Sequence, residues 1–102
     1  MTYRIEQHRE QLTELCRQYH VRRLALFGSA LREDFDPERS DFDFLVEFEP
    51  LPASTYADAY FDLMEALQRL LGHPVDLVVE SAITNPYFRE SIAHSQALLY
   101  AG

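Results

Sequence analysis

The sequence predicts an α/β (α+β) fold in which helices flank a small mixed β-sheet. Three apolar runs have the length and composition of strands, and they lie at 21–27, 42–48 and 74–80. Between the second and third runs, residues 55–71 carry apolar side chains at the spacing of an amphipathic helix. Parallel strands need a crossover of this kind, so the chain contains the helix that a parallel arrangement of the second and third strands requires.

The chain is short enough that we expect one domain, spanning residues 1–102. No apolar run approaches the ~20 residues that cross a bilayer. The first residues also lack the apolar stretch of a secretory signal. We therefore expect a cytoplasmic protein with no membrane partner. Cys16 is the only cysteine, which excludes internal disulfides, and its place in a helical pattern predicts a buried thiol.

The charge balance bears on the possible partners. The formal net charge is −8, and all nine basic residues are arginines. Since Lys and Arg contacts to phosphate dominate non-specific affinity for nucleic acid, stable binding to a long DNA or RNA is disfavoured. A small nucleotide whose charge is masked by a metal remains compatible, as does a basic protein partner.

The first part of the chain predicts a helix followed by a strand. Residues 2–19 place apolar side chains at helical spacing, and these are Ile5, Leu12, Leu15, Cys16 and Tyr19. The strand at 21–27 begins with two arginines, Arg22 and Arg23. We expect them to be solvated, with contact to phosphate as the alternative.

Capping signals set the limits of the other helices. Ser54 or Thr55 is expected to cap the helix at 55–71, with Thr55 and Asp58 forming a capping box and Gly72 ending it. Its predicted apolar face consists of Tyr56, Tyr60, Phe61, Met64, Leu67, Leu70 and Leu71. A further helix is expected from 87 to about 95, capped by Asn85-Pro86, with Phe88 and Ile92 facing inward. A short edge strand is expected at 97–100.

Two polar motifs flank the loop between the first two strands. Asp41 and Asp43 stand two residues apart at the start of a strand, so their carboxylates point to the same side and call for a cation between them. Carboxylates and phosphate oxygens suit Mg²⁺. Gly28 and Ser29, directly after the first strand, suit phosphate through backbone N–H groups and a hydroxyl. Taken singly, the acidic pair also fits a surface and Gly-Ser also fits a plain turn.

Arg32 and Asp76 each allow two interpretations. Arg32 fits either an ion pair with the acidic loop at 33–39 or an approach to phosphate. Asp76 fits either an acid that reaches solvent at the start of its strand or a third carboxylate of the site. If the Gly-Ser loop and the aspartates share one edge of the sheet, the first strand is antiparallel to the second, and Asp76 joins the site.

The combined pattern resembles the minimal nucleotidyltransferases of the DNA polymerase β-like superfamily. It consists of an apolar run, Gly28-Ser29, Arg32, and then Ser-Asp-x-Asp ending at Asp43. The resemblance implies a nucleotidyltransferase fold in which Gly28, Ser29 and Arg32 hold the nucleotide. It also implies that Asp41, Asp43 and Asp76 are catalytic and bind two Mg²⁺ ions. Glu33 departs from the family pattern, in which glycine usually follows the arginine.

Small members of this kind resemble the MNT antitoxins of HEPN/MNT toxin–antitoxin pairs. The resemblance implies an enzyme that transfers AMP from ATP to a tyrosine of a HEPN ribonuclease toxin, as a homo- or hetero-oligomer. Two alternatives stay open. One is an antitoxin that acts by binding alone, and the other is a nucleotidyltransferase for a small molecule or tRNA.

Overall fold

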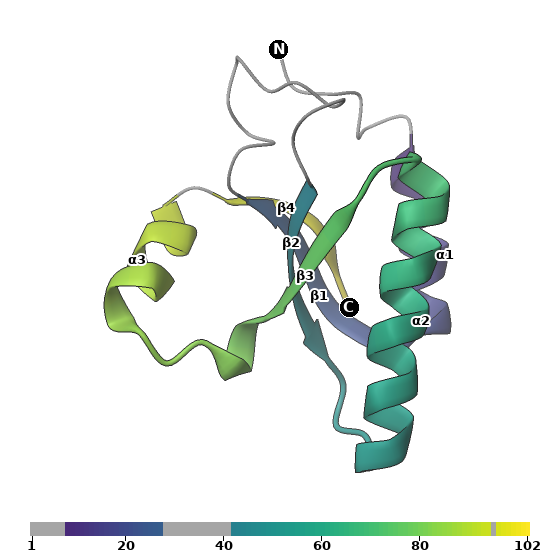
Figure 1. The fold of residues 1–102 in the computed structure, drawn as a ribbon, viewed down its shortest axis with the longest axis horizontal. Helices are drawn as coiled ribbons and strands as arrows, with labels where there is room; N and C mark the ends of the chain where they lie inside the picture. Colours follow the sequence, from purple (N-terminus) through teal and green to yellow (C-terminus); the bar gives the residue numbers. More distant parts are fainter. Residues whose placement is uncertain (1–7, 28–41, 95) are drawn as a thin grey trace.

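The computed structural model describes residues 8–27, 42–94 and 96–102, whose strands form one mixed sheet (Figure 1). The strands are β1 Val21–Phe27, β2 Phe42–Phe48, β3 Val75–Val79 and β4 Gln96–Ala101, in the spatial order β3-β2-β1-β4. β2 and β3 are parallel, and β1 is antiparallel to both of its neighbours. The predicted mixed sheet and the directions of its first three strands are thus confirmed.

The helices lie on both sides of the sheet. α1 Arg9–Gln18 and α2 Ala53–Leu71 cover one face, and α3 Pro86–His94 lies on the other side (Figure 1). α2 is the crossover that joins the parallel strands, and a short 3-10 turn, Glu80–Ala82, follows β3. Within the described ranges, no helix is long and apolar enough to cross a membrane.

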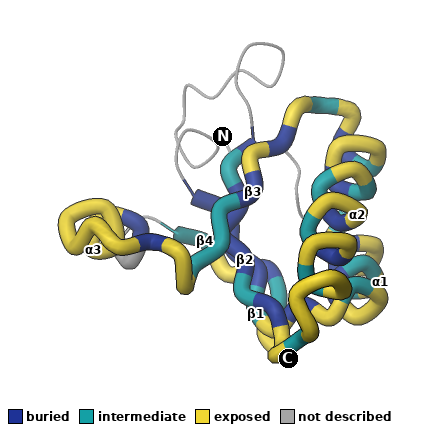
Figure 2. Tube along the Cα trace, turned by 60° about the horizontal axis from the view of Figure 1, so that its bottom comes forward, coloured by how far each residue is buried: buried dark blue, intermediate teal, exposed yellow. Residues whose placement is uncertain are grey.

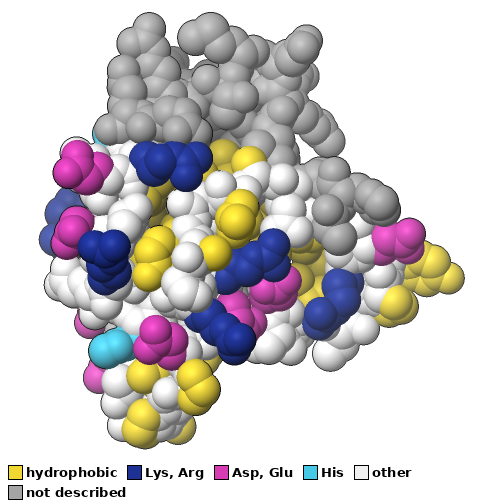
Figure 3. Space-filling model, turned by 180° about the vertical axis from the view of Figure 1, so that it is seen from behind, with side chains coloured by type: hydrophobic (Ala, Val, Ile, Leu, Met, Phe, Trp, Pro, Cys, Tyr) yellow, Lys and Arg dark blue, Asp and Glu magenta, His cyan; other side chains and the backbone are white. Residues whose placement is uncertain are grey.

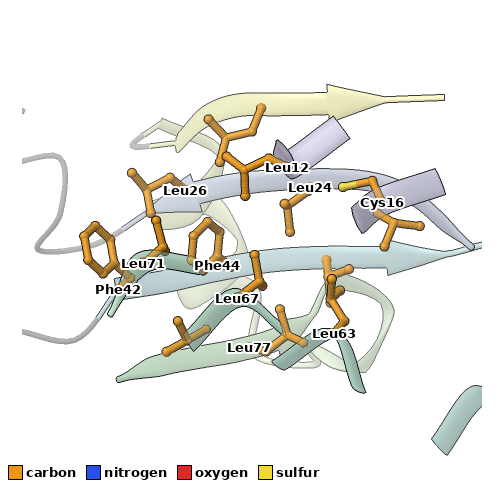
Figure 4. Close-up of a cluster of buried hydrophobic side chains, with 14 of the residues drawn as sticks. Leu12, Cys16, Leu24, Leu26, Phe42, Phe44, Leu63, Leu67, Leu71 and Leu77 are labelled. Carbon is orange, nitrogen blue, oxygen red and sulfur yellow. The ribbon is translucent and has the colours of Figure 1, made fainter. Parts of the chain in front are cut away.

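The main core fills the space between the sheet and the two helices α1 and α2 (Figure 4). Its innermost side chains come from both layers, and they include Leu12, Cys16, Leu24, Leu26, Phe42, Phe44, Leu63 and Leu67. A smaller cluster lies on the opposite face and consists of Ala25, Phe27, Leu45, Ile83 and Ile92. Because strand side chains alternate between faces, β1 and β2 are buried on both sides (Figure 2). Cys16 is fully buried, as predicted.

The N-terminus of α2 differs from the prediction. The helix begins at Ala53 after Pro52, with no side-chain cap. The backbone N–H of Tyr56 donates to the Pro52 carbonyl at 2.8 Å, so Thr55 is already inside the first turn. The predicted capping box of Thr55 and Asp58 is therefore wrong. The other end is confirmed, because Gly72 terminates the helix in the left-handed conformation, with φ of 71°.

The buried face of α2 is also rotated relative to the predicted one. Ala59 and Leu63, which the prediction omitted, are buried with Leu67 and Leu71 at intervals of four residues. Phe61 lies two positions from both Ala59 and Leu63 and is 64% exposed. Two helical positions correspond to roughly 200° of rotation, so Phe61 faces away from the core.

The cap of α3 agrees with the prediction. The Asn85 Oδ1 accepts hydrogen bonds from the backbone N–H groups of Tyr87 and Phe88, at 2.9 and 3.2 Å. Ile92 is buried as expected. Phe88 is 43% exposed, although its ring lies edge-on to Phe27 with 6.3 Å between centroids. The inward orientation predicted for Phe88 is thus only partly realised.

The ends of the remaining strands and of the first helix differ from the predicted ends by a few residues. β3 is shorter than the predicted 74–80, and β4 is longer than the predicted 97–100. Within the described residues the first helix begins at Arg9, while residues 2–7 of the predicted helix lie outside them. None of these shifts changes the topology.

Candidate active site at the ends of β2 and β3

One row of paired residues crosses the sheet where β2 and β3 begin. Asp43 of β2 is the register partner of Asp76 of β3. On its other side Asp43 pairs with Phe27 of β1, which in turn pairs with Gln96 of β4. Residues in register on neighbouring strands direct their side chains to the same face of a sheet. The structure therefore brings together two of the three predicted metal-binding aspartates.

The face that carries this row is the one opposite α1 and α2. The residues on either side of the two aspartates belong to the main core, and they are Phe42, Phe44, Val75 and Leu77. Since side chains alternate along a strand, Asp43 and Asp76 point to the α3 side of the sheet. Phe27, between Asp43 and Gln96 in the row, belongs to the small apolar cluster on this side.

Both aspartates remain accessible. Asp43 is half-buried and Asp76 is exposed, and among the described residues no charged side chain is buried. Asp76 thus reaches solvent, as one of its two interpretations predicted. Its register with Asp43 places it beside the candidate site, as the other interpretation requires. Neighbouring strands lie roughly 5 Å apart, so the two side chains stand next to one another on this face. Such an oxygen-rich pair fits a hard divalent cation such as Mg²⁺.

The other predicted site residues, Gly28, Ser29, Arg32 and Asp41, lie outside the described residues. In the chain, Gly28 directly follows Phe27 and Asp41 directly precedes Phe42. Both motifs are therefore attached to strand ends in or next to the row. Within the described part, no group of three or more His, Cys, Asp or Glu side chains is arranged to hold a metal.

Tyr60 of α2 lies close to the aspartate row. Its hydroxyl donates a hydrogen bond of 2.6 Å to the backbone carbonyl of Leu77, the residue after Asp76. Burial raises the pKa of the Tyr60 hydroxyl, and the negative charge of Asp76 raises it further. The sequence indicated only an apolar role for Tyr60. The sequence feature that could have predicted this contact is a tyrosine on the helix that connects the two parallel strands.

The two arginines of β1 behave differently from one another. Arg22 is exposed, as expected. The Arg23 guanidinium donates to the Glu80 carboxylate at 3.1 Å and to the Gln96 side-chain carbonyl at 3.3 Å. Arg23 thus links β1 to β4 and to the turn after β3. Its side chain is still 38% exposed, so the expectation that it is solvated is only partly right.

The far end of this face carries a hollow of about 350 Å³. It is lined by Arg22, Arg23, Glu47, Glu80 and the last two residues, Ala101 and Gly102. Its arginines are balanced by carboxylates. Among the described residues on the face seen in Figure 3, basic and acidic side chains are likewise interspersed. That long nucleic acids are poor ligands stays a prediction from the net charge.

Comparison with known proteins identifies relatives over most of the chain. Residues 8–98 match the family described as "Nucleotidyltransferase domain". A Methanocaldococcus jannaschii protein, provisionally named a protein adenylyltransferase, is 41% identical over 88 residues, which cover 86% of this chain and 83% of that protein.

Solved structures agree on the fold. One, provisionally described as a minimal nucleotidyltransferase, is 32% identical, with a TM-score of 0.75 over 91% of this chain and 90% of the other. A second contains an MNT antitoxin in complex with a tri-AMPylated HEPN toxin of Shewanella oneidensis. It is 20% identical, with a TM-score of 0.64 over 95% of this chain and 72% of the other, and at that identity it shows the fold alone.

Proposed function

Since this chain belongs to the nucleotidyltransferase domain family, we propose that it transfers AMP from ATP to a tyrosine of a HEPN-type toxin and so neutralises the toxin. The observation that carries the proposal is the register of Asp43 opposite Asp76 on one accessible face. The sequence attaches Gly28-Ser29 and Asp41 to the same end of the sheet. A phosphate-binding motif beside three carboxylates is what metal-assisted nucleotidyl transfer requires.

The proposed reaction is an in-line displacement at the α-phosphorus of ATP. The tyrosine oxygen of the toxin forms the new bond to the α-phosphorus. The bond from the α-phosphorus to the oxygen that bridges it to the β-phosphorus breaks, and pyrophosphate leaves. Asp76 accepts the tyrosine proton, and Gly28, Ser29 and Arg32 hold the phosphates. Asp41, Asp43 and Asp76 would hold two Mg²⁺ ions, which neutralise charge on the phosphates when bound.

The choice of a protein acceptor rests on the relatives and on the charge. The Methanocaldococcus jannaschii relative bears the name of a protein adenylyltransferase, and the Shewanella oneidensis structure pairs a similar fold with an AMPylated HEPN toxin. A net charge of −8 suits a basic protein partner better than a nucleic acid. The transfer would take place in the cytoplasm, and a hetero-oligomer with the toxin would deliver the acceptor tyrosine.

One observation favours a second candidate, an antitoxin that neutralises by contact alone. Glu33 stands where the family pattern usually has glycine, and it adds negative charge close to the residues proposed to hold the triphosphate. In that case binding to the toxin would not depend on Asp41 or Asp43.

The two candidates are separated by incubating the protein with its cognate HEPN toxin, ATP and Mg²⁺. Transfer predicts that mass spectrometry finds one or more AMP units on a toxin tyrosine, and that the toxin stays inactive after the antitoxin is removed. The Asp41→Asn/Asp43→Asn variant, tested at equal concentration, serves as the control for contact inhibition. Neutralisation by that variant as strong as by wild type would show that catalysis is not the mechanism.

A further inference from the structure

The strand that carries Asp76 has a free edge. β3 is the outermost strand of the order β3-β2-β1-β4, so among the described strands it pairs with β2 alone. The backbone N–H of Phe42 donates to the Pro74 carbonyl at 3.1 Å, which shows that this carbonyl points toward β2. Because carbonyls alternate in direction along a strand, that of Asp76 also points toward β2, whereas that of Leu77 points to the free edge.

The Tyr60 hydroxyl occupies this free edge at Leu77. It donates to the Leu77 carbonyl at 2.6 Å, and the Leu77 side chain is at the same time buried in the main core. The residue after Asp76 is therefore held twice, by its side chain and by its backbone carbonyl. A tyrosine hydroxyl with the ordinary pKa of 10.0 is already protonated at neutral pH, and burial and the charge of Asp76 raise the pKa of Tyr60 further, so the hydroxyl is a hydrogen-bond donor.

We propose that Tyr60 is a positioning residue for the transfer reaction, which holds Asp76 opposite Asp43 by anchoring the free edge of β3 to α2. This inference rests on the proposed function. Tyr60 acts through the Leu77 peptide and touches no reactant. Its loss would leave β3 paired with β2 but would loosen the carboxylate proposed to accept the tyrosine proton, and small displacements of such groups slow catalysis strongly.

The same helix supplies a matched control one turn earlier. Tyr56 is also half-buried on α2, and its ring lies edge-on to Phe48 with 5.1 Å between centroids. Burial raises the pKa of Tyr56 as it does that of Tyr60, and negative charge on Glu47 and on Tyr60 raises it further. Among the described residues, however, the Tyr56 hydroxyl has no hydrogen-bond partner, so it does not hold a β3 carbonyl as the Tyr60 hydroxyl does. Tyr56→Phe and Tyr60→Phe thus each remove one hydroxyl from α2, but only Tyr60→Phe removes a hydrogen bond to β3.

The test compares the two variants with wild type in steady-state transfer of AMP to the toxin. We expect Tyr60→Phe to lower kcat roughly 10-fold, the lower limit usual for residues that orient metal or catalytic ligands, with the KM for ATP unchanged. Tyr56→Phe should leave both parameters at wild-type values. In the metal-free protein, hydrogen exchange of the β3 amides should be faster in Tyr60→Phe than in Tyr56→Phe.

A double-mutant cycle with Asp76→Asn distinguishes positioning from a general loss of stability. If Tyr60 acts through Asp76, Tyr60→Phe adds no further decrease in an Asp76→Asn background. Additive decreases, or a kcat of Tyr60→Phe equal to wild type, would overturn the inference and leave the proposed function standing. Absence of transfer by wild type would instead refute the proposed function, and the role of Tyr60 with it.

Discussion

Asp43 and Asp76 are register partners on parallel strands, although the whole of helix α2 separates them in the chain. Their proximity is therefore a property of the tertiary fold, and it depends on how α2 returns the chain to the sheet. Gly72 allows the reversal with a positive φ, and the Tyr60 hydroxyl bonds the strand that follows. Any change that shifts β3 by one residue would move Asp76 to the opposite face.

The first prediction concerns metal-dependent binding of ATP. The Asp41→Asn/Asp43→Asn variant should lose most of the gain in affinity that Mg²⁺ gives, because neutral amides are weaker ligands for a hard cation. Since even outer-shell changes cost metal sites ~10-fold or more, the loss should be at least that large. Calorimetric titration with ATP, with and without Mg²⁺, measures it.

Glu49→Gln provides the control, because Glu49 is an exposed acid just beyond the other end of β2. It removes one negative charge without touching the aspartate row. Equal affinity of the double variant and wild type in the presence of Mg²⁺ would refute the assignment of the site.

The second prediction separates Asp76 from the nucleotide-binding residues. Asp76→Asn should retain the fold and most of the affinity for ATP, while transfer slows by ~10²-fold, the usual scale for a positioned base. Because Asp76 is exposed, its replacement by Asn should leave the fold intact, and circular dichroism checks this directly. Asp62→Asn, an exposed acid on α2, should transfer AMP at the wild-type rate. An unchanged rate in Asp76→Asn would return Asp76 to a structural role.

The sequence predicted the mixed sheet and, on the condition that the polar motifs share one of its edges, the presence of Asp76 in the site. The apolar run of β2 has the predicted limits, Phe42–Phe48, and the helix at α2 implied that β3 would be parallel to it. Once the strand directions are known, the alternation of side chains places Asp43 and Asp76 on one face. Hydrophobic periodicity and strand topology were therefore enough to place Asp43 and Asp76 on the same face of the sheet.

The contacts between elements could not be predicted in the same way. Which side of α2 faces the sheet depends on packing against both the sheet and α1, and the sequence pattern placed Phe61 inward although it is 64% exposed. The bonds of Tyr60 to Leu77 and of Arg23 to Glu80 join residues far apart in the chain. Their partners are fixed only when helix rotation and strand order are both known.

The last prediction follows from the burial of Cys16, which raises the pKa of its thiol from 9.0 to about 12. In the unfolded chain the thiol ionises near its ordinary value, while in the folded protein it keeps its proton. Between these two values the unfolded state therefore binds fewer protons, and the free energy of unfolding falls as pH rises. Below the lower value Cys16 adds no pH dependence. From about pH 8 to about pH 10 the loss from this thiol alone should be about 1.4 kcal/mol.

Urea denaturation under reducing conditions at these two pH values measures the effect. Cys16→Ala is expected to be less stable at both, since it leaves a small cavity in the main core, but its stability should fall less with pH. Tyr56 and Tyr60 have raised pKa values too, from an ordinary value of 10.0, so they contribute mainly above this window. Both tyrosines are also present in wild type and in Cys16→Ala. The difference between the two proteins in the decrease of unfolding free energy from pH 8 to pH 10 therefore reports on Cys16 alone. Equal falls in wild type and Cys16→Ala would mean that the thiol ionises at the same pH in the folded and unfolded states, contrary to its complete burial.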